Sequence, residues 1–180
     1  MTALFRAFLL TLSILGLASC GSNSKFQTYH GPSVTLIEVH KADRKMFLMH
    51  DGKVLKSYDI QLGGNPIGPK QFEGDSKTPE GAYLISHRNP NSTYHLSLGV
   101  SYPNAAQIAF AKAAGEEPGG DIFIHGQPGW TKVQGDWTVG CIAVTDKEIE
   151  QIYAMVNPGT QINIFPSGEK KGAARPPKSA

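Results

Sequence analysis

The sequence has little of what several classes of protein require. It has 180 residues, only two cysteines, a formal net charge of only +2, and no apolar run after residue 19 long enough to cross a bilayer. A near-neutral chain lacks the basic surface of a nucleic-acid-binding domain, so we expect no nucleic-acid partner. It contains no HExxH motif of a zinc peptidase and no Gly-Lys-Ser/Thr ending of a phosphate-binding loop. The length leaves room for one domain of ordinary size.

The first 19 residues have the pattern of an export signal. Arg6 precedes an apolar run over residues 7–17 that is too short to span a membrane. The run ends in Leu-Ala-Ser-Cys20-Gly21, which resembles the bacterial lipoprotein box, where the cysteine is lipidated after cleavage. We therefore expect removal of residues 1–19 and a lipidated Cys20. The alternative is a plain secretory signal that happens to contain a cysteine, and either signal exports the protein.

A lipid on Cys20 would hold the protein in the periplasm, on a membrane. Acyl chains contribute about 0.8 kcal/mol per buried methylene, so several chains anchor a domain without any transmembrane helix. Gly21, in place of an aspartate, favours the outer membrane of a Gram-negative host. Residues 20–33 are polar and turn-rich, which predicts a flexible tether after the lipidated cysteine. The basic tail 167–180 has too few apolar residues to fold and is expected to be disordered.

The remaining residues, 34–166, have the pattern of a mainly β domain with two short helices, an α+β fold. The 20 glycines and 12 prolines favour many turns. Apolar and β-branched runs predict strands over residues 34–39, 45–50, 54–62, 81–87, 93–98, 121–125, 138–144 and 160–165, with a hairpin turn at Asp51-Gly52. Helices are predicted over residues 105–114 and from an N-cap at Thr145 to a point before Asn157. Residues 63–79 are expected to form a long ordered loop.

The chemistry is expected at Cys141 and His125, two reactive residues at the ends of predicted strands. If Cys20 is acylated, Cys141 is the one thiol left in an exported protein and has no disulfide partner. A cysteine attacks as a thiolate, and its ordinary pKa of about 8.5 must be lowered by a neighbour such as a protonated histidine. Two adjacent strands could supply that neighbour in His125. The alternative is a buried inert cysteine beside a structural histidine.

Glycines beside these residues suit the same chemistry. Gly126 follows the histidine and Gly140 precedes the cysteine, and glycine lets the backbone approach a substrate closely. The amides of Gly140 and Cys141 are the candidate donors to an oxyanion, and Thr138 belongs to the same segment. Tyr94, His95 and Trp137 are less secure candidates for substrate contact, since packing explains such residues equally well.

An ordered set of motifs resembles one known family over residues 34–166. The motifs are Lys56-Ser57-Tyr58, Leu62-Gly63, Gly68-Pro69-Lys70, Gly74-Asp75, Thr78-Pro79-Glu80-Gly81, Ser101-Tyr102-Pro103-Asn104, Ile124-His125-Gly126 and Thr138-Val139-Gly140-Cys141-Ile142-Ala143-Val144-Thr145. Together they resemble the L,D-transpeptidase (YkuD-like) catalytic domain, and in particular its branch of short periplasmic murein enzymes.

The resemblance implies a fold, a reaction and partners. The fold would be the L,D-transpeptidase β-sandwich or partly open barrel. A cysteine, here Cys141, would form a thioester with a peptidoglycan stem peptide at meso-diaminopimelate and release D-Ala, with an upstream histidine, here His125, as base. An amine would then take the acyl group, either from another stem, giving a 3→3 cross-link, or from a wall-attached lipoprotein. Acyl transfer through a thiol needs no cofactor and no metal.

Two departures from the family pattern leave alternatives open. The family places a histidine before the glycine that precedes the nucleophile and an arginine two residues after it, where this chain has Val139 and Ala143. The same thioester could therefore pass to water, making the chain a hydrolase that cuts L,D cross-links or releases bound lipoprotein. A third reading is a non-catalytic lipoprotein that binds peptidoglycan.

Overall fold

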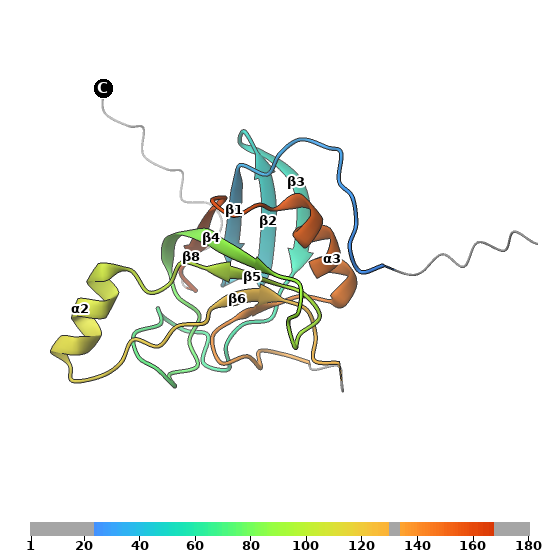
Figure 1. Ribbon diagram of the computed structural model, residues 1–180. Coiled ribbons are helices and arrows are strands. Elements are labelled where there is room, and N and C mark those ends of the chain that lie inside the picture. Colours follow the sequence, from blue (N-terminus) through green and yellow to red (C-terminus); the bar gives the residue numbers. More distant parts are fainter. Residues whose placement is uncertain (1–23, 130–133, 168–180) are drawn as a thin grey trace, which may run out of the picture.

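The computed structural model describes residues 24–129 and 134–167 of the chain (Figure 1). Two helices lie in this part, α2 (Ala105–Ala113) and α3 (Asp146–Met155). The strands, in chain order, are β1 (Leu36–His40), β2 (Lys45–His50), β3 (Lys53–Asp59), β4 (Gly81–Asn89), β5 (Ser97–Val100), β6 (Phe123–His125), β7 (Ile142–Ala143) and β8 (Gln161–Phe165).

The strands form one curled sheet in the order β3-β2-β1-β8-β4-β5-β6-β7. The chain after β3 returns to the opposite edge, where Gln61 bridges Ala143 and Gly63 bridges Thr138. The sheet therefore curls into a half-barrel, and the expected mainly β fold with two short helices is confirmed.

Local signals in the sequence account for several of these elements. Asp51 and Gly52 both have positive φ, 45° and 79°, which is the conformation of a type I′ hairpin turn between β2 and β3. Thr145 caps α3 as expected, because its side chain accepts from the Glu148 amide while the Glu148 carboxylate accepts from the Thr145 amide.

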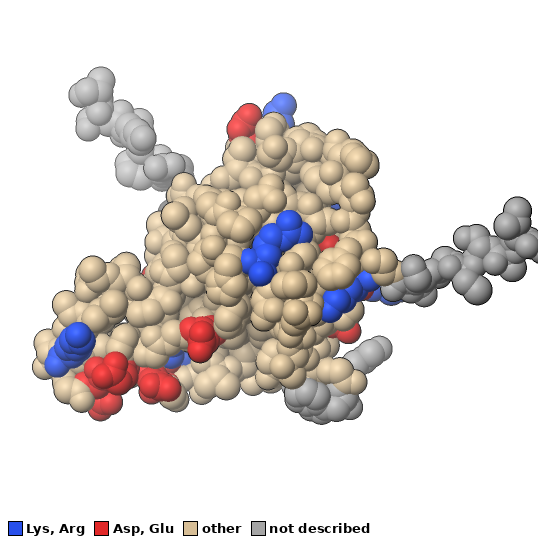
Figure 2. Space-filling model, viewed as in Figure 1, with Lys and Arg blue, Asp and Glu red and all other residues tan. Residues whose placement is uncertain are grey.

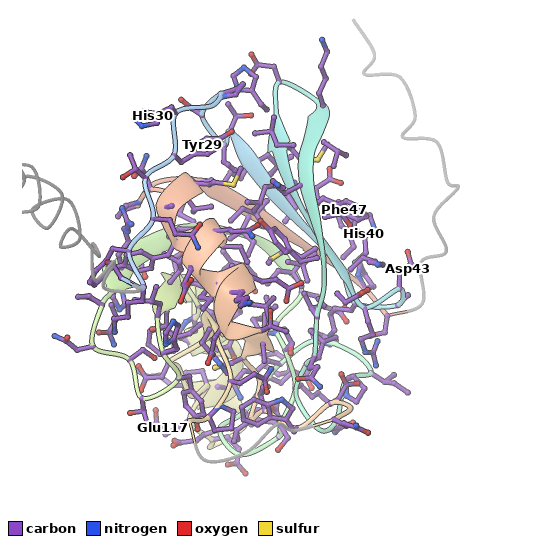
Figure 3. The ribbon with its side chains drawn as sticks, turned by 90° about the vertical axis from the view of Figure 1, so that its right-hand side faces the viewer. Tyr29, His30, His40, Asp43, Phe47 and Glu117 are labelled. Carbon is purple, nitrogen blue, oxygen red and sulfur yellow. The ribbon has the colours of Figure 1, made fainter. Side chains whose placement is uncertain are left out.

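The core lies between the curled sheet and α3. Alternate residues of the strands point into it, and the fully buried members include Ile37, Leu48, Ile85, Leu98 and Ile162. From α3 the buried side chains are Ile149, Ile152, Tyr153 and Met155, which lie on one face of the helix. Figure 3 shows this helix lying across the sheet.

Two predicted strands differ from the observed ones. The strand expected over residues 93–98 begins only at Ser97, because His95 has a positive φ of 71° and the Leu96 amide bonds back to the Tyr94 carbonyl. The strand expected over residues 138–144 is reduced to Ile142–Ala143, because Gly140 has a φ of 130° that breaks the extended backbone.

The segment over residues 24–33 carries no helix or strand, but it lies along α3 (Figure 3). Lys25 Nζ donates to the Pro90 carbonyl at 2.7 Å, Gln27 Nε2 donates to Glu150 at 3.1 Å, and the Phe26 ring lies 6.2 Å from that of Tyr153. The expected signal peptide, Cys20 and residues 168–180 of the tail lie outside the described residues. Within the described residues, no helix is both long enough and apolar enough to cross a membrane.

The surface in Figure 2 carries few charged side chains, and acidic ones gather toward the end of the molecule that holds α2. Glu116 and Glu117, both exposed, follow that helix in the sequence.

A buried lysine orders the long loop over residues 63–79. Lys41, fully buried after β1, donates through Nζ to the carbonyls of Gly68 at 2.8 Å and Thr78 at 2.9 Å, and to Glu80 at 2.8 Å. Burial lowers the pKa of Lys41, and Glu80 opposes that shift by its hydrogen bond and its charge. A loop of this length without regular structure is therefore held by polar contacts from the sheet.

Replacing Lys41 by alanine is expected to lower the free energy of unfolding by about 3–5 kcal/mol, because Glu80 would lose its buried partner. Lys45→Ala is the matched control, because Lys45 pairs with Asp59 at the surface and should cost at most about 1 kcal/mol. Urea unfolding followed by circular dichroism measures both. Equal losses in the two variants would contradict the structural role given to Lys41.

Candidate active site

His125 is the last residue of β6, and Cys141 directly precedes β7, the parallel neighbour of β6. In the parallel pair of β6 and β7, Ile124 faces Ile142 and His125 faces Ala143. Both isoleucines are fully buried in the core, so His125 and Ala143 point to the opposite face of the sheet. Cys141, two residues before Ala143, shares that face and lies diagonally from His125.

The His125 ring is held in one tautomer. Its Nδ1 lies 2.7 Å from the Gly126 carbonyl oxygen, which can only accept, so Nδ1 carries the hydrogen. In the neutral ring Nε2 then holds the lone pair and can take a proton. The side chain is buried, with 3% of the residue exposed, and this burial lowers the pKa of His125.

Two of the expected aromatic candidates pack on this ring. The Tyr94 ring centroid lies 4.5 Å from that of His125, and the Trp137 ring lies 5.7 Å away in an edge-to-face arrangement. Trp137 Nε1 donates to Gln61 Oε1 at 2.9 Å, which fixes the indole. His95 is placed elsewhere, because its Nε2 lies 2.8 Å from Glu150 of α3. We therefore leave His95 out of the candidate site.

The Cys141 thiol lies 3.4 Å from the Asp121 carbonyl oxygen, to which it donates. Burial raises the pKa of this thiol, and the Phe123 backbone opposes the shift with a hydrogen bond. The expectation that a positive imidazole lowers the pKa of the thiol is wrong for this geometry, because burial favours the neutral form of both groups. The resting pair is a thiol and a neutral imidazole.

The turn before the nucleophile requires glycine at position 140. Its φ is 130°, and a Cβ there would lie 2.6 Å from the Lys77 carbonyl oxygen. Thr138 Oγ1 accepts from the Gly140 amide at 3.2 Å and donates to the Cys141 carbonyl at 2.8 Å. Of the two amides expected to stabilise an oxyanion, that of Gly140 is thus already bonded, and the Cys141 amide is the candidate that remains.

Gly126 has a packing role. A Cβ there would lie 2.5 Å from Asp146 Oδ1, at the start of α3. The Gly126 amide donates to the Tyr94 carbonyl at 3.0 Å, and its carbonyl accepts from His125. Gly126 thus brings the histidine loop against the helix and orients the imidazole, rather than offering an amide to substrate.

Residues that sequence reasoning missed hold the site together. Asp136 accepts from the Leu62 amide at 2.9 Å and forms an ion pair with Arg44 at 2.7 Å. Gln61 accepts from both Trp137 and Gln127, so it ties the two ends of the loop that follows His125. No local pattern in the sequence marks either residue, because their partners lie 66 or more residues away.

The two departures from the family pattern lie in different environments. Val139 is 70% exposed, whereas Ala143 is fully buried next to His125 in the register of the two strands. In the described part of the chain, no group of three or more His, Cys, Asp or Glu side chains could hold a metal ion.

Replacing Thr138 by valine is expected to lower kcat about 10- to 100-fold. The change leaves the buried Gly140 amide without its acceptor, and an unpaired buried group costs about 1–3 kcal/mol. Thr138→Ser keeps the hydroxyl and should stay within about threefold of the wild type. Steady-state kinetics on a stem peptide measures both, and a valine variant as active as the serine variant would contradict this role.

Comparisons with known proteins agree with this geometry. A model of the L,D-transpeptidase catalytic domain matches residues 34–164. The protein YafK of Escherichia coli (strain K12), which carries a provisional L,D-transpeptidase name, is 30% identical over 147 residues. That match covers 74% of this chain and 54% of YafK, so the chain spans about half the length of this curated relative.

Solved structures show the same fold. The helical cell shape determining protein Pgp2 from Campylobacter jejuni is 26% identical, with a TM-score of 0.59 over 80% of this chain and 51% of that chain. Bd1075 from Bdellovibrio bacteriovorus is 24% identical, with a TM-score of 0.53 over 78% of this chain and 51% of that chain, a likeness of fold. Because the family model covers more than half of the sequence and includes both Cys141 and His125, the chain belongs to the L,D-transpeptidase catalytic domain family.

Proposed function

We propose that this chain is a peptidoglycan L,D-transpeptidase in which Cys141 is the nucleophile and His125 the base. The observation that carries the proposal is the placement of His125 at the end of β6 and of Cys141 directly before β7, the parallel neighbour of β6, with His125 Nδ1 occupied by the Gly126 carbonyl. This arrangement leaves Nε2 free to exchange a proton with the thiol and with an amine. Family membership supports the same reaction class.

In the first half of the reaction, the substrate is a stem peptide bearing D-Ala after meso-diaminopimelate. Cys141 Sγ attacks the diaminopimelate carbonyl carbon as the thiol proton passes to His125 Nε2. The Cys141 amide stabilises the oxyanion of the tetrahedral intermediate. The intermediate collapses by breaking the bond to the D-Ala nitrogen, which takes the proton from His125, and D-Ala leaves with a thioester in place.

In the second half, an acceptor amine attacks the thioester carbonyl and gives a proton to His125 Nε2. The carbon–sulfur bond breaks, and the departing sulfur takes that proton back. His125 thus serves as base and then as acid in each half, which suits a ring whose pKa is lowered by burial and which is neutral at rest. An acceptor on another stem gives a 3→3 cross-link, and a lysine of a wall-attached lipoprotein gives an attachment.

We further propose that the protein is periplasmic and that a lipid on Cys20 anchors it in the outer rather than the inner membrane. The sequence of residues 1–21 supports it, with a short apolar run ending in Leu-Ala-Ser-Cys-Gly. The Lys25, Phe26 and Gln27 contacts with the domain would then bring the folded part close to the anchor.

A second candidate is hydrolysis of the same thioester. Ala143 leaves the buried position beside His125 without a polar side chain, and Val139 is exposed where the family has a histidine. Loss of side chains that would hold an acceptor favours transfer to water.

Muropeptide analysis tests these proposals. Isolated sacculi are incubated with residues 21–180 and, as control, with the Cys141→Ala variant. New 3→3 dimers that depend on Cys141 would establish the transpeptidase. Loss of cross-links or release of lipoprotein with new tripeptide ends would establish the hydrolase. Sacculus binding without any Cys141-dependent product would overturn both and leave a non-catalytic peptidoglycan-binding protein.

A further inference from the structure

A hollow of about 400 Å³ lies on the outer face of β4, β5 and β6. The residues that matter for its chemistry are Ser86, His87, Gly99, Ser101, Asp121 and Phe123. None of them has a role in the reaction steps above, apart from the Asp121 backbone carbonyl that accepts from the thiol.

The hollow begins beside the nucleophile. Gly99 faces Phe123 in the register of β5 and β6. Cys141 directly precedes β7, at the position that continues the β6–β7 register opposite Phe123, and its thiol accepts a hydrogen bond from the Phe123 backbone. Since residues directly across a sheet point to the same face, the thiol and the hollow share one face. The 3.4 Å contact between Cys141 Sγ and the Asp121 carbonyl oxygen joins them directly.

The shape of the hollow is built by a bulge and a glycine. The register of β4 with β5 shifts between Ile85 and Arg88, and bulges of this kind re-aim side chains. The His87 ring consequently lies over Gly99, where a Cβ would come within 2.4 Å of Cε1. The ring rests edge-on against Phe123, with centroids 5.7 Å apart, and Nδ1 lies 2.9 Å from Ser86 Oγ. His87 is thus fixed with Nε2 available to a ligand.

The proton path decides which part of the substrate enters this hollow. His125 must contact the nitrogen that leaves and the nitrogen that arrives, so both amines lie on the His125 side of Cys141. The acyl part therefore extends the other way, from the thiol toward Asp121 and Phe123. Its side chain is the group that meets the hollow.

The polar groups of the hollow suit a ligand with both charges. Asp121 is exposed and supplies a carboxylate for an ammonium group. The Ser101 hydroxyl already accepts from the Leu84 amide at 2.9 Å, so its hydrogen is free to donate to a carboxylate, as is the His87 imidazole.

We propose that this hollow binds the ammonium–carboxylate end of the diaminopimelate side chain of the acyl donor, with Asp121 on the ammonium and His87 and Ser101 on the carboxylate. The inference rests on the proposed function. It makes His87 a determinant of donor choice and Asp121 a determinant of donor binding. A donor with lysine at the third position offers an ammonium but no carboxylate and should be acylated more slowly.

The test measures the second-order rate of acyl-enzyme formation by mass spectrometry with two synthetic tetrapeptides, one carrying meso-diaminopimelate and one carrying lysine. We expect the wild type to prefer the first donor. His87→Ala should lower the ratio of the two rates at least tenfold, because it removes a group that contacts the carboxylate. Asp121→Asn should lower both rates about equally and leave their ratio nearly unchanged, because both donors carry the ammonium. Asparagine tolerates the positive φ of 53° at position 121, so this second variant keeps the backbone. His30→Ala is the matched control, because His30 is an exposed histidine of the N-terminal segment 24–33 and does not line the hollow.

The outcomes separate the two proposals. Acylation with an unchanged ratio in His87→Ala, or with unchanged rates in Asp121→Asn, would overturn the role of the hollow and leave the transpeptidase intact. No acylation of the wild type by either donor would overturn the proposed function and this inference with it. A ratio that falls in His87→Ala, two rates that fall together in Asp121→Asn, and unchanged values in His30→Ala would establish the hollow as the donor subsite.

Discussion

Exchange of Cys141 for serine is expected to lower kcat for stem-peptide transfer by about 10⁴- to 10⁶-fold while leaving the fold intact. A serine hydroxyl is smaller than the thiol and can still donate to the Asp121 carbonyl that now accepts from Sγ. The loss would therefore be chemical. A hydroxyl is a far weaker acid than a thiol. It attacks only when a base takes its proton and a further group stabilises the positive charge that the base then carries.

The surroundings of His125 provide little of that stabilisation. Its Nδ1 bonds to the neutral Gly126 carbonyl, and burial lowers the pKa of the ring. In a serine hydrolase a carboxylate holds the same nitrogen and supports the imidazolium. A thiol needs less support because it is the stronger acid and because its sulfur is intrinsically nucleophilic. The His125 environment thus suits a cysteine at position 141.

The serine variant is measured by kcat with a donor and an acceptor stem, together with the mass of any acyl-enzyme. Cys141→Ala sets the background, and circular dichroism confirms that both variants are folded. A serine variant that kept a tenth of the wild-type kcat would show that the attacking group lies elsewhere.

The position of the nucleophile depends on contacts that begin far from it. Lys41 holds the Thr78 carbonyl at 2.9 Å, and the Thr78 hydroxyl accepts from the Gly63 amide at 3.2 Å. A Cβ on Gly63 would lie 3.1 Å from the Gly140 Cα, so the two backbones are in close contact. A buried lysine on the opposite part of the sheet therefore sets where the turn before Cys141 can lie.

Much of the fold could be predicted because its signals are local. The Asp51-Gly52 turn and the Thr145 cap depend on residues within four positions of each other, and both are observed. Strands that end at His125 and that run over residues 138–144 were also predicted. The two observed strands, β6 and the shorter β7 over Ile142–Ala143, are neighbours in the sheet.

What the sequence could not predict depends on contacts between distant segments. Gln61 reaches Trp137, and Asp136 reaches the Leu62 amide, with no spacing rule to reveal either. The hollow beside Cys141 requires a bulge in β4 and a glycine in β5, neither of which periodicity predicts. The direction of the Cys141 pKa shift was missed for the same reason, because burial arises from packing.

Replacing His125 by glutamine is expected to lower kcat/KM about 10²- to 10⁴-fold and to change the shape of its pH profile. Burial lowers the pKa of His125 below its ordinary value of 6.5, so the neutral base persists to lower pH. In the wild type kcat/KM should be flat near neutrality and fall only as the pH drops through this lowered pKa. Because burial raises the pKa of Cys141, no alkaline change is expected near neutrality.

In the glutamine variant no base takes the thiol proton, so the residual rate follows the thiolate fraction. That rate should rise about tenfold for each pH unit until the pH reaches the raised pKa of Cys141. His40→Gln is the matched control, because His40 pairs with Glu38 on β1 at 3.2 Å and lies next to Phe47 at the end of that strand (Figure 3). It should keep the wild-type profile. A glutamine variant that kept the wild-type profile, flat near neutrality and falling at the same low pH, would mean that another residue titrates in the wild type. His125 would then lose its role as base.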